Sequence, residues 1–303
     1  KARNQPRRPP EVAERPLTPR YELEADGAFR IDHYHVAPAL CSFLPGLGGL
    51  DGVPLWCLYV NRAQAVVSFG VQDKDHALAE FLPATWAYQL VGLQGFRTLC
   101  LVDGTFYEPL GLAPLEPADG TRSLRIRADR LELSETNTRR GLRCDVAYFS
   151  VVHAPLGALV RQVRLTNTGS APRRVTLLDG LPIVVPAGLT DHGLKALRHI
   201  HEAYASVRLT CGHVPYYMAR VAAHDEAEVV RLTSGNFYAA WVGRAGEWTP
   251  TEPYVDPHLV FGPGQDLVTP RLLIARGLPD RNAQVWENRL PCALVPATAV
   301  LDP

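Results

Sequence analysis

A short run of ionisable side chains is the first place in this sequence that could do chemistry. Residues 72–76 (QDKDH) directly follow an apolar, strand-like run. Two carboxylates, an ammonium group and an imidazole at a strand end could exchange protons with a substrate or hydrogen-bond the hydroxyls of a sugar. A solvated turn held by local ion pairs has the same composition, and such turns are common. We therefore take Asp73, Lys74, Asp75 and His76 as candidates for contact with a substrate or with another domain, without a catalytic role.

Tryptophan is the second residue type whose surroundings point to a ligand. An indole presents a flat apolar face, and the C–H face of a pyranose ring can stack on it. Trp248 lies in a loop-like stretch, Gly246–Pro250, and we expect it to be exposed and available for such a contact. Trp56, Trp86 and Trp241 lie in apolar runs, so we expect them in the core.

The sequence offers little for a metal, a nucleotide or a covalent intermediate. His33 and His35 would share one side of a strand, but no third ligand follows at a zinc-site spacing. His199 and His201 are two apart on a predicted helix and face different directions. The glycine-rich stretch 44–54 lacks a dinucleotide fingerprint and the lysine of a P-loop, and there is no GxSxG elbow. We expect no metal and no organic cofactor.

Short strand-like runs dominate the chain and must position these candidates. Residues 123–127 and 130–133 alternate apolar and polar side chains, which is typical of strands with one buried and one solvated face. Residues 163–177 read as two strands around a polar turn, which predicts that the two pair with each other. The expected strands are Leu55–Val60, Ala65–Val71, Phe96–Val102, Ser123–Leu133, Arg143–Val152, Leu159–Leu165, Arg174–Leu178, Glu228–Leu232, Asn236–Val242 and Arg271–Ala275.

One segment has a helical pattern. Within Gly193–Arg208, apolar residues recur every three or four positions, and Thr190 and Asp191 precede it as possible caps. One helix among about ten strands argues against a repeated βαβ pattern. The expected fold is mainly β, two large stacked antiparallel sheets with one or few helices.

Composition and charge exclude some partners. The chain has 303 residues, 31 basic and 31 acidic, so its zero net charge gives no overall attraction to nucleic acid or to an anionic membrane. Residues 1–20 carry six basic and two acidic residues and five prolines, which predicts a flexible arm. Residues 21–303 are expected to form the folded domain, and neither nucleic acid nor membrane is an expected partner.

Cysteine spacing and hydropathy indicate the compartment. The six cysteines are dispersed without a CxxC pair, so we expect small buried hydrophobes in a reduced, cytoplasmic environment. No apolar run reaches 18 residues, and the first residues lack the apolar core of a secretory signal.

Many segments, in order along the chain, match one known family. They are Ser42–Gly46, Gly52–Trp56, Tyr59–Arg62, Ser68–Gly70, Lys74–His76, Glu80–Ala84, Ala87–Tyr88, Gly95–Thr98, Leu178–Pro182, Gly235–Tyr238, Val255–Pro257, Phe261–Gly262 and Glu287–Cys292. From about Phe29 onward the chain resembles the amino-terminal region of the cellobiose-phosphorylase family, in particular its members that act on β-1,2-oligoglucans. Ala63 departs from the pattern, in which glycine usually follows Asn-Arg.

The resemblance implies a fold and two domains with different roles. Family members have a large β-supersandwich similar to galactose mutarotase, followed by an (α/α) barrel with the general-acid aspartate and the phosphate-binding residues. Inorganic phosphate, the co-substrate, attacks the anomeric carbon with inversion and gives α-glucose 1-phosphate without a metal or organic cofactor. This sequence ends at Pro303 without a barrel pattern, and no position matches the catalytic motif, so the resemblance supplies no catalytic residue here.

Three functions remain open. The resemblance favours a structural and substrate-shaping sandwich domain of a glycoside phosphorylase, inactive on its own. Its expected partners are a β-glucan oligosaccharide, the (α/α) barrel and, through dimer contacts, a second copy. The alternative is a stand-alone carbohydrate-binding module that uses Trp248. The third is a mutarotase-like or lyase-like enzyme active in this domain alone.

Overall fold

The computed structural model describes residues 17–44, 47–48, 52–197, 200–221, 230–244, 246–264 and 266–303. Within these ranges the fold is mainly β, as predicted, and every pair of named strands is antiparallel. Residues 1–16 of the predicted arm 1–20, residues 45–46 and 49–51 of the glycine-rich stretch 44–54 and the first two residues of the expected strand Glu228–Leu232 lie outside the described residues.

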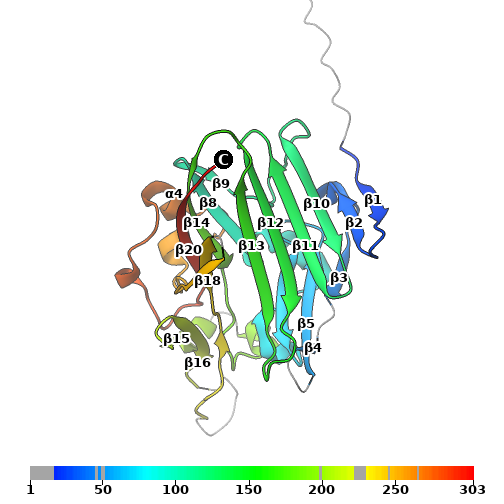
Figure 1. Ribbon diagram of the computed structural model, residues 1–303. Coiled ribbons are helices and arrows are strands. Elements are labelled where there is room, and N and C mark those ends of the chain that lie inside the picture. Colours follow the sequence, from blue (N-terminus) through cyan, green and yellow to red (C-terminus); the bar gives the residue numbers. More distant parts are fainter. Residues whose placement is uncertain are drawn as a thin grey trace, which may run out of the picture.

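One large sheet crosses the molecule (Figure 1). Its six strands are, in spatial order, β1 (Arg20–Leu23), β2 (Phe29–Asp32), β10 (Gly120–Ile126), β11 (Arg130–Asn137), β12 (Leu142–Ser150) and β13 (Leu159–Asn167). The run 123–133, predicted as one strand, divides into β10 and β11 around a turn. Along β11, Leu131 and Leu133 are buried while Glu132 points to the outer face, so the predicted alternation is confirmed.

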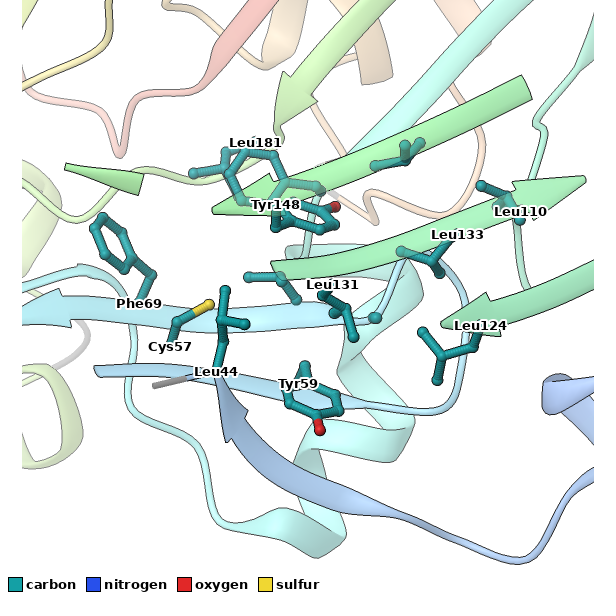
Figure 2. Packing of buried hydrophobic residues seen from close by; sticks show 14 of the residues in the cluster. Leu44, Cys57, Tyr59, Phe69, Leu110, Leu124, Leu131, Leu133, Tyr148 and Leu181 are labelled. Atoms are coloured by element: carbon teal, nitrogen blue, oxygen red, sulfur yellow. The ribbon is translucent and has the colours of Figure 1, made fainter. Parts of the chain in front are cut away.

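A second sheet faces the inner side of the first. It contains, in order, β3 (Cys41–Leu44), β5 (Val53–Val60), β6 (Val66–Val71) and β7 (Ala77–Ala79), and β4 (Leu47–Gly48) also pairs with β5. Figure 2 shows Leu124 and Leu131 of the first sheet packed toward Cys57, Tyr59 and Phe69 of the second, all in one buried cluster. Burial of this apolar surface holds the two layers together.

Smaller sheets complete the fold. A four-stranded sheet has the order β20 (Ala293–Leu301), β14 (Arg173–Leu181), β8 (Arg97–Val102) and β9 (Thr105–Tyr107). A three-stranded sheet contains β15 (Ala205–Thr210), β16 (Val214–Ala219) and β17 (Asn236–Phe237), and β18 (Trp241–Arg244) pairs with β19 (Glu247–Pro250). The run 236–242, predicted as one strand, is therefore split between β17 and β18.

The predicted pairing of the strands within 163–177 is wrong. The polar turn is present, but β13 pairs with β12, whereas β14 lies between β8 and β20 in another sheet. A polar turn predicts a change of direction. Whether the chain pairs with itself or passes to another sheet depends on which partners are available in space.

The helices are short and differ from the sequence prediction. They are α1 (Ala84–Gln94), α2 (Asp191–Ala196), α3 (His258–Phe261), α4 (Arg271–Arg276) and the 3-10 turns η1 (Tyr34–Val36), η2 (Lys74–His76), η3 (His201–Tyr204) and η4 (Arg281–Ala283). None of these helices in the described part of the chain is long and apolar enough to cross a membrane.

Two predictions made from the spacing of apolar residues are wrong. The predicted helix Gly193–Arg208 stops at Ala196, and its last residues form β15 paired with β16. The expected strand Arg271–Ala275 is helix α4, which begins after Pro270 and ends at Gly277. Short apolar runs fit both periods, and the flanking proline and glycine are the better signal for a helix here.

Candidate functional site

A wide groove of about 630 Å³ lies on the outer face of the six-stranded sheet. This volume is in the range of small-molecule sites, about 300–1,000 Å³. The side chains that line it point away from the core because they alternate with buried residues along each strand. They include Glu24, Arg30, Thr121, Ser123, Arg125, Glu132, Ser134, Thr136, Arg143, Asp145, Gln162 and Arg164.

Strand register places these groups in rows across the sheet. Ser123 lies opposite Ser134, which lies opposite Asp145, which in turn lies opposite Arg164. Directly opposed side chains on neighbouring strands have Cβ atoms about 4.5–5.5 Å apart. The groove therefore offers hydroxyl, carboxylate and guanidinium groups at short intervals along a line that crosses β10 to β13.

Arginine side chains pair with the carboxylates of the groove. The Glu132 carboxylate lies 3.1 Å from Arg125 and 3.7 Å from Arg127. Asp145 lies 2.8 Å from the Nε of Arg143. Glu24 also pairs with Arg125. Such carboxylates accept hydrogen bonds but are not placed to give a proton to a leaving group, so the groove is suited to binding more than to acid–base catalysis.

The β13 side of the groove carries polar groups that are available to a ligand. Gln162 and Arg164 are exposed, and the side chain of neither forms a hydrogen bond or ion pair with another described residue. An amide and a guanidinium together supply donors and an acceptor. We therefore regard this side as the place where a ligand would make its first polar contacts.

The predicted cluster 73–76 lies apart from the residues that line the groove. It follows β6 and forms η2. Asp73 accepts a hydrogen bond from the backbone N–H of Asp75 at 2.9 Å and lies 2.7 Å from Nδ1 of His76. The hydrogen bond with His76 is the main cause that lowers the pKa of Asp73. These contacts fit the alternative interpretation, a turn with local ion pairs.

The other two members of the cluster bind helix α2. Asp75 accepts a hydrogen bond from the backbone N–H of Asp191 at 2.8 Å. The buried Asp191 carboxylate lies 3.1 Å from Lys74 Nζ and 2.6 Å from Lys195 Nζ. Burial opposes ionisation of Asp191, but hydrogen bonds from Lys195 and Lys74 outweigh it and lower its pKa. These polar groups thus fasten η2 to α2.

The burial of the tryptophans agrees only in part with the prediction. Trp248 is exposed, as predicted, but it lies on β19, outside the groove. Trp86 and Trp241 are also exposed, so their assignment to the core is wrong. Trp56 is half-buried, and its Nε1 donates to the carbonyl of Asp73 at 2.8 Å. Apolar neighbours in sequence did not predict burial because Trp86 and Trp241 lie on outward faces of their elements.

The histidines form no metal site within the described ranges, where no group of three or more potential ligands occurs. The prediction that His33 and His35 share a strand is wrong: His35 lies in η1, and His33 precedes it with φ of 56°. Their ring centroids are 6.4 Å apart. His199 lies outside the described residues.

Most cysteines follow the prediction. Cys57, Cys100, Cys144 and Cys292 are buried and unpaired. Burial raises the pKa of Cys57 to about 12. Cys41 is half-buried and Cys211 is exposed, so these two depart from the predicted burial.

Segments that carry the family resemblance make contacts in the interior. Asn61 accepts a hydrogen bond from the N–H of Leu40 at 2.9 Å. Thr98 donates to Asp179 at 2.6 Å, and the guanidinium of Arg289 lies 2.6 Å from Asp256. These contacts join segments that are distant from one another in the sequence.

The groove was not among the sites predicted from the sequence. Part of it could have been found in the sequence, because the solvent-facing positions of the predicted strands 123–127 and 130–133 carry Ser, Arg and Glu. Alternation predicts which side chains share a face of one strand, but not which strands become neighbours. The groove depends on five strands, β2 and β10 to β13, lying side by side.

A scan against models of known protein families finds none that matches the chain, and a search of curated proteins finds no relative.

Proposed function

We propose that the chain is a carbohydrate-handling β-domain that holds an oligosaccharide in the groove of its six-stranded sheet. The observation that carries the proposal is the groove itself, in which hydroxyl, amide, guanidinium and carboxylate groups share one open face. A sugar presents many hydroxyls, each a donor and an acceptor, and such a mixed surface can pair with them. An open groove also suits a linear oligomer, whose ends can extend past the site.

We further propose that the two facing sheets are part of a β-supersandwich of the galactose-mutarotase kind. The domain would then belong to a glycoside phosphorylase similar to the cellobiose-phosphorylase family. That enzyme cleaves a β-glucan with inorganic phosphate and yields α-glucose 1-phosphate, without a metal or organic cofactor. Its general acid and phosphate-binding residues lie in an (α/α) barrel outside this sequence, and the enzyme works in the cytoplasm. The collinear motifs support this assignment.

The ion pairs of the groove support a binding role over catalysis in this domain. Glycoside cleavage by two carboxylates requires one of them to act as a proton donor. Glu132 and Asp145 are each held by arginine. The domain in this proposal shapes and holds the substrate, and the chemistry takes place elsewhere.

A stand-alone carbohydrate-binding module is the second candidate. The exposed indole of Trp248 favours it, because such modules bind sugars by stacking. The two candidates differ in whether the domain contributes to turnover of a longer protein.

Calorimetric titration of the chain with a β-1,2-linked gluco-oligosaccharide tests the proposal. We expect binding, and we expect the variant Gln162→Ala/Arg164→Ala to bind at least about tenfold more weakly, since it loses two polar contacts. Arg208→Ala is the matched control, an exposed arginine on β15 outside the groove. Its affinity should equal that of the wild type.

Two results would contradict the proposal. The first is a wild-type chain that binds none of the gluco-oligosaccharide. The second is release of α-glucose 1-phosphate when the isolated chain is incubated with oligosaccharide and phosphate, because catalysis would then lie within these 303 residues.

A further inference from the structure

The β18–β19 hairpin turns an apolar face to solvent. In its register Trp241 lies opposite Pro250, and Gly243 lies opposite Trp248. Alternate residues of a strand share a face, so these four residues lie on one side of the hairpin. The side chains of Trp241 and Trp248 are 54% and 56% exposed. Two large indoles on one exposed face are unusual for residues that normally pack inside.

The opposite face of the hairpin contacts the rest of the protein. Arg244 donates to the carbonyl of Val300 at 3.3 Å and forms an ion pair with Asp302. Figure 1 shows β18 beside β20, the strand in which Val300 lies. On this face Arg244 therefore reaches β20, whereas both indoles of the other face are left exposed, the reverse of what core burial would produce.

The Trp248 ring lies against the backbone of the opposite strand of the hairpin. A Cβ built on Gly243 would lie 2.9 Å from two ring atoms of Trp248, so the indole covers the backbone of this glycine. A ring over a cross-strand glycine is fixed on one face by the backbone. Its other face points to solvent, which is a prepared surface for stacking that loses little freedom on binding.

The size of this face decides between a small ligand and a protein partner. Aromatic side chains bury about 150–250 Å² each, so two half-exposed indoles offer on the order of 200 Å². A stable protein interface needs about 800 Å² from each partner. Arg244 and Glu247 lie on the other face and give this one no charge of its own. The available area fits one or two neutral sugar rings.

We propose that Trp241 and Trp248 form an aromatic platform that stacks the pyranose rings of a neutral oligosaccharide. The platform is a second contact, distinct from the groove, whose lining residues do not include either indole. The inference rests on the proposed carbohydrate function only in the choice of ligand. It concerns different residues, so the two can fail separately.

Calorimetric titration with a β-1,2-linked gluco-oligosaccharide tests the platform. Trp248→Ala and Trp241→Ala should each weaken binding by up to about tenfold, the range of one lost stacking contact. Trp248→Phe should lose less, since a smaller flat ring remains. Trp86→Ala is the matched control, a tryptophan 54% exposed on helix α1, and should bind as the wild type does. Circular dichroism of each variant confirms that it is folded.

The groove variant separates the two proposals. Weaker binding in the platform variants with an unaffected Gln162→Ala/Arg164→Ala chain would support the platform and count against the groove. Unchanged binding in both platform variants overturns the platform, whatever the groove variant does. A change in the sedimentation coefficient of Trp241→Ala or Trp248→Ala without a change in sugar affinity also overturns it, because the face would then bind protein.

Discussion

The guanidinium of Arg161 and the carboxylate of Asp179 form a two-pronged ion pair inside the protein. Nη2 of Arg161 lies 2.8 Å from Oδ1 of Asp179, and Nε lies 3.1 Å from Oδ2. The Arg161 side chain is almost completely buried. Arg161 belongs to β13 and Asp179 to β14, so the pair links two sheets that share no backbone hydrogen bonds at this point.

Other groups complete this buried network. Arg161 also donates to the Tyr148 hydroxyl and to the side-chain oxygen of Gln64, each at 2.5 Å. Its guanidinium lies 5.0 Å from the centre of the Phe96 ring. A buried charge is tolerated only when it is paired and hydrogen-bonded, and this one is.

Removal of Arg161 should therefore cost much stability. We expect Arg161→Met to lower the free energy of unfolding by about 3 kcal/mol or more, because Asp179 is left without its partner. Arg161→Met/Asp179→Leu should lose less than the single variant. Urea unfolding followed by circular dichroism measures both.

An exposed pair serves as the control for this prediction. Arg143→Met removes the surface pair with Asp145, and we expect a loss below about 1 kcal/mol. If Arg143→Met and Arg161→Met lowered the free energy of unfolding equally, the buried pair would contribute no more stability than the exposed one.

The contacts of η2 with α2 predict the effect of changing Asp191. Asp191→Asn removes one charge between Lys74 and Lys195, and we expect it to cost about 1–3 kcal/mol. Hydrogen exchange should become faster in α2 and η2, while oligosaccharide affinity stays the same. His192→Ala, an exposed position on the same helix, is the control. Loss of sugar affinity in Asp191→Asn would instead support the interpretation of η2 as a loop that contacts the substrate.

His35 predicts how stability depends on pH. Burial, assisted by Arg122, His33 and Arg62, lowers the pKa of His35 from 6.5 to about 4. Between these values the unfolded chain binds a proton that the folded chain does not, so the free energy of unfolding falls as the pH drops from about 6.5 to about 4. The contribution is fully present above this window.

A His35→Gln variant isolates this effect. His258 also has a lowered pKa and remains in both chains, so the difference between the two curves reports His35 alone. We expect the variant to lose less stability than the wild type between about pH 7 and pH 4.5 in urea unfolding. Parallel curves would show that His35 does not titrate in this window.

Thiol labelling should separate the cysteines by burial. Iodoacetamide reacts with the thiolate, and burial disfavours that form. We expect Cys211 to be labelled in the native protein, and Cys57, Cys100, Cys144 and Cys292 only in denaturant. Mass spectrometry of digests measures each site, and native labelling of Cys57 would contradict its buried position.

Local properties of the chain could be predicted from short stretches of sequence. Alternation along 130–133 predicted which side chains of β11 face the core, and dispersed apolar cysteines predicted the burial of Cys57 and Cys144. These properties depend on neighbours along the chain, because a strand places successive side chains on opposite faces whatever its partners are.

Which elements contact one another became known only from the folded chain. The turn after β13 leads to β14 in another sheet, and Asp75 binds the backbone of Asp191, 116 residues away. The groove likewise requires Ser134, Asp145 and Arg164 to lie opposite one another on three strands. Contacts of this kind depend on competition among all possible partners for burial and hydrogen bonds, which no short stretch of sequence contains.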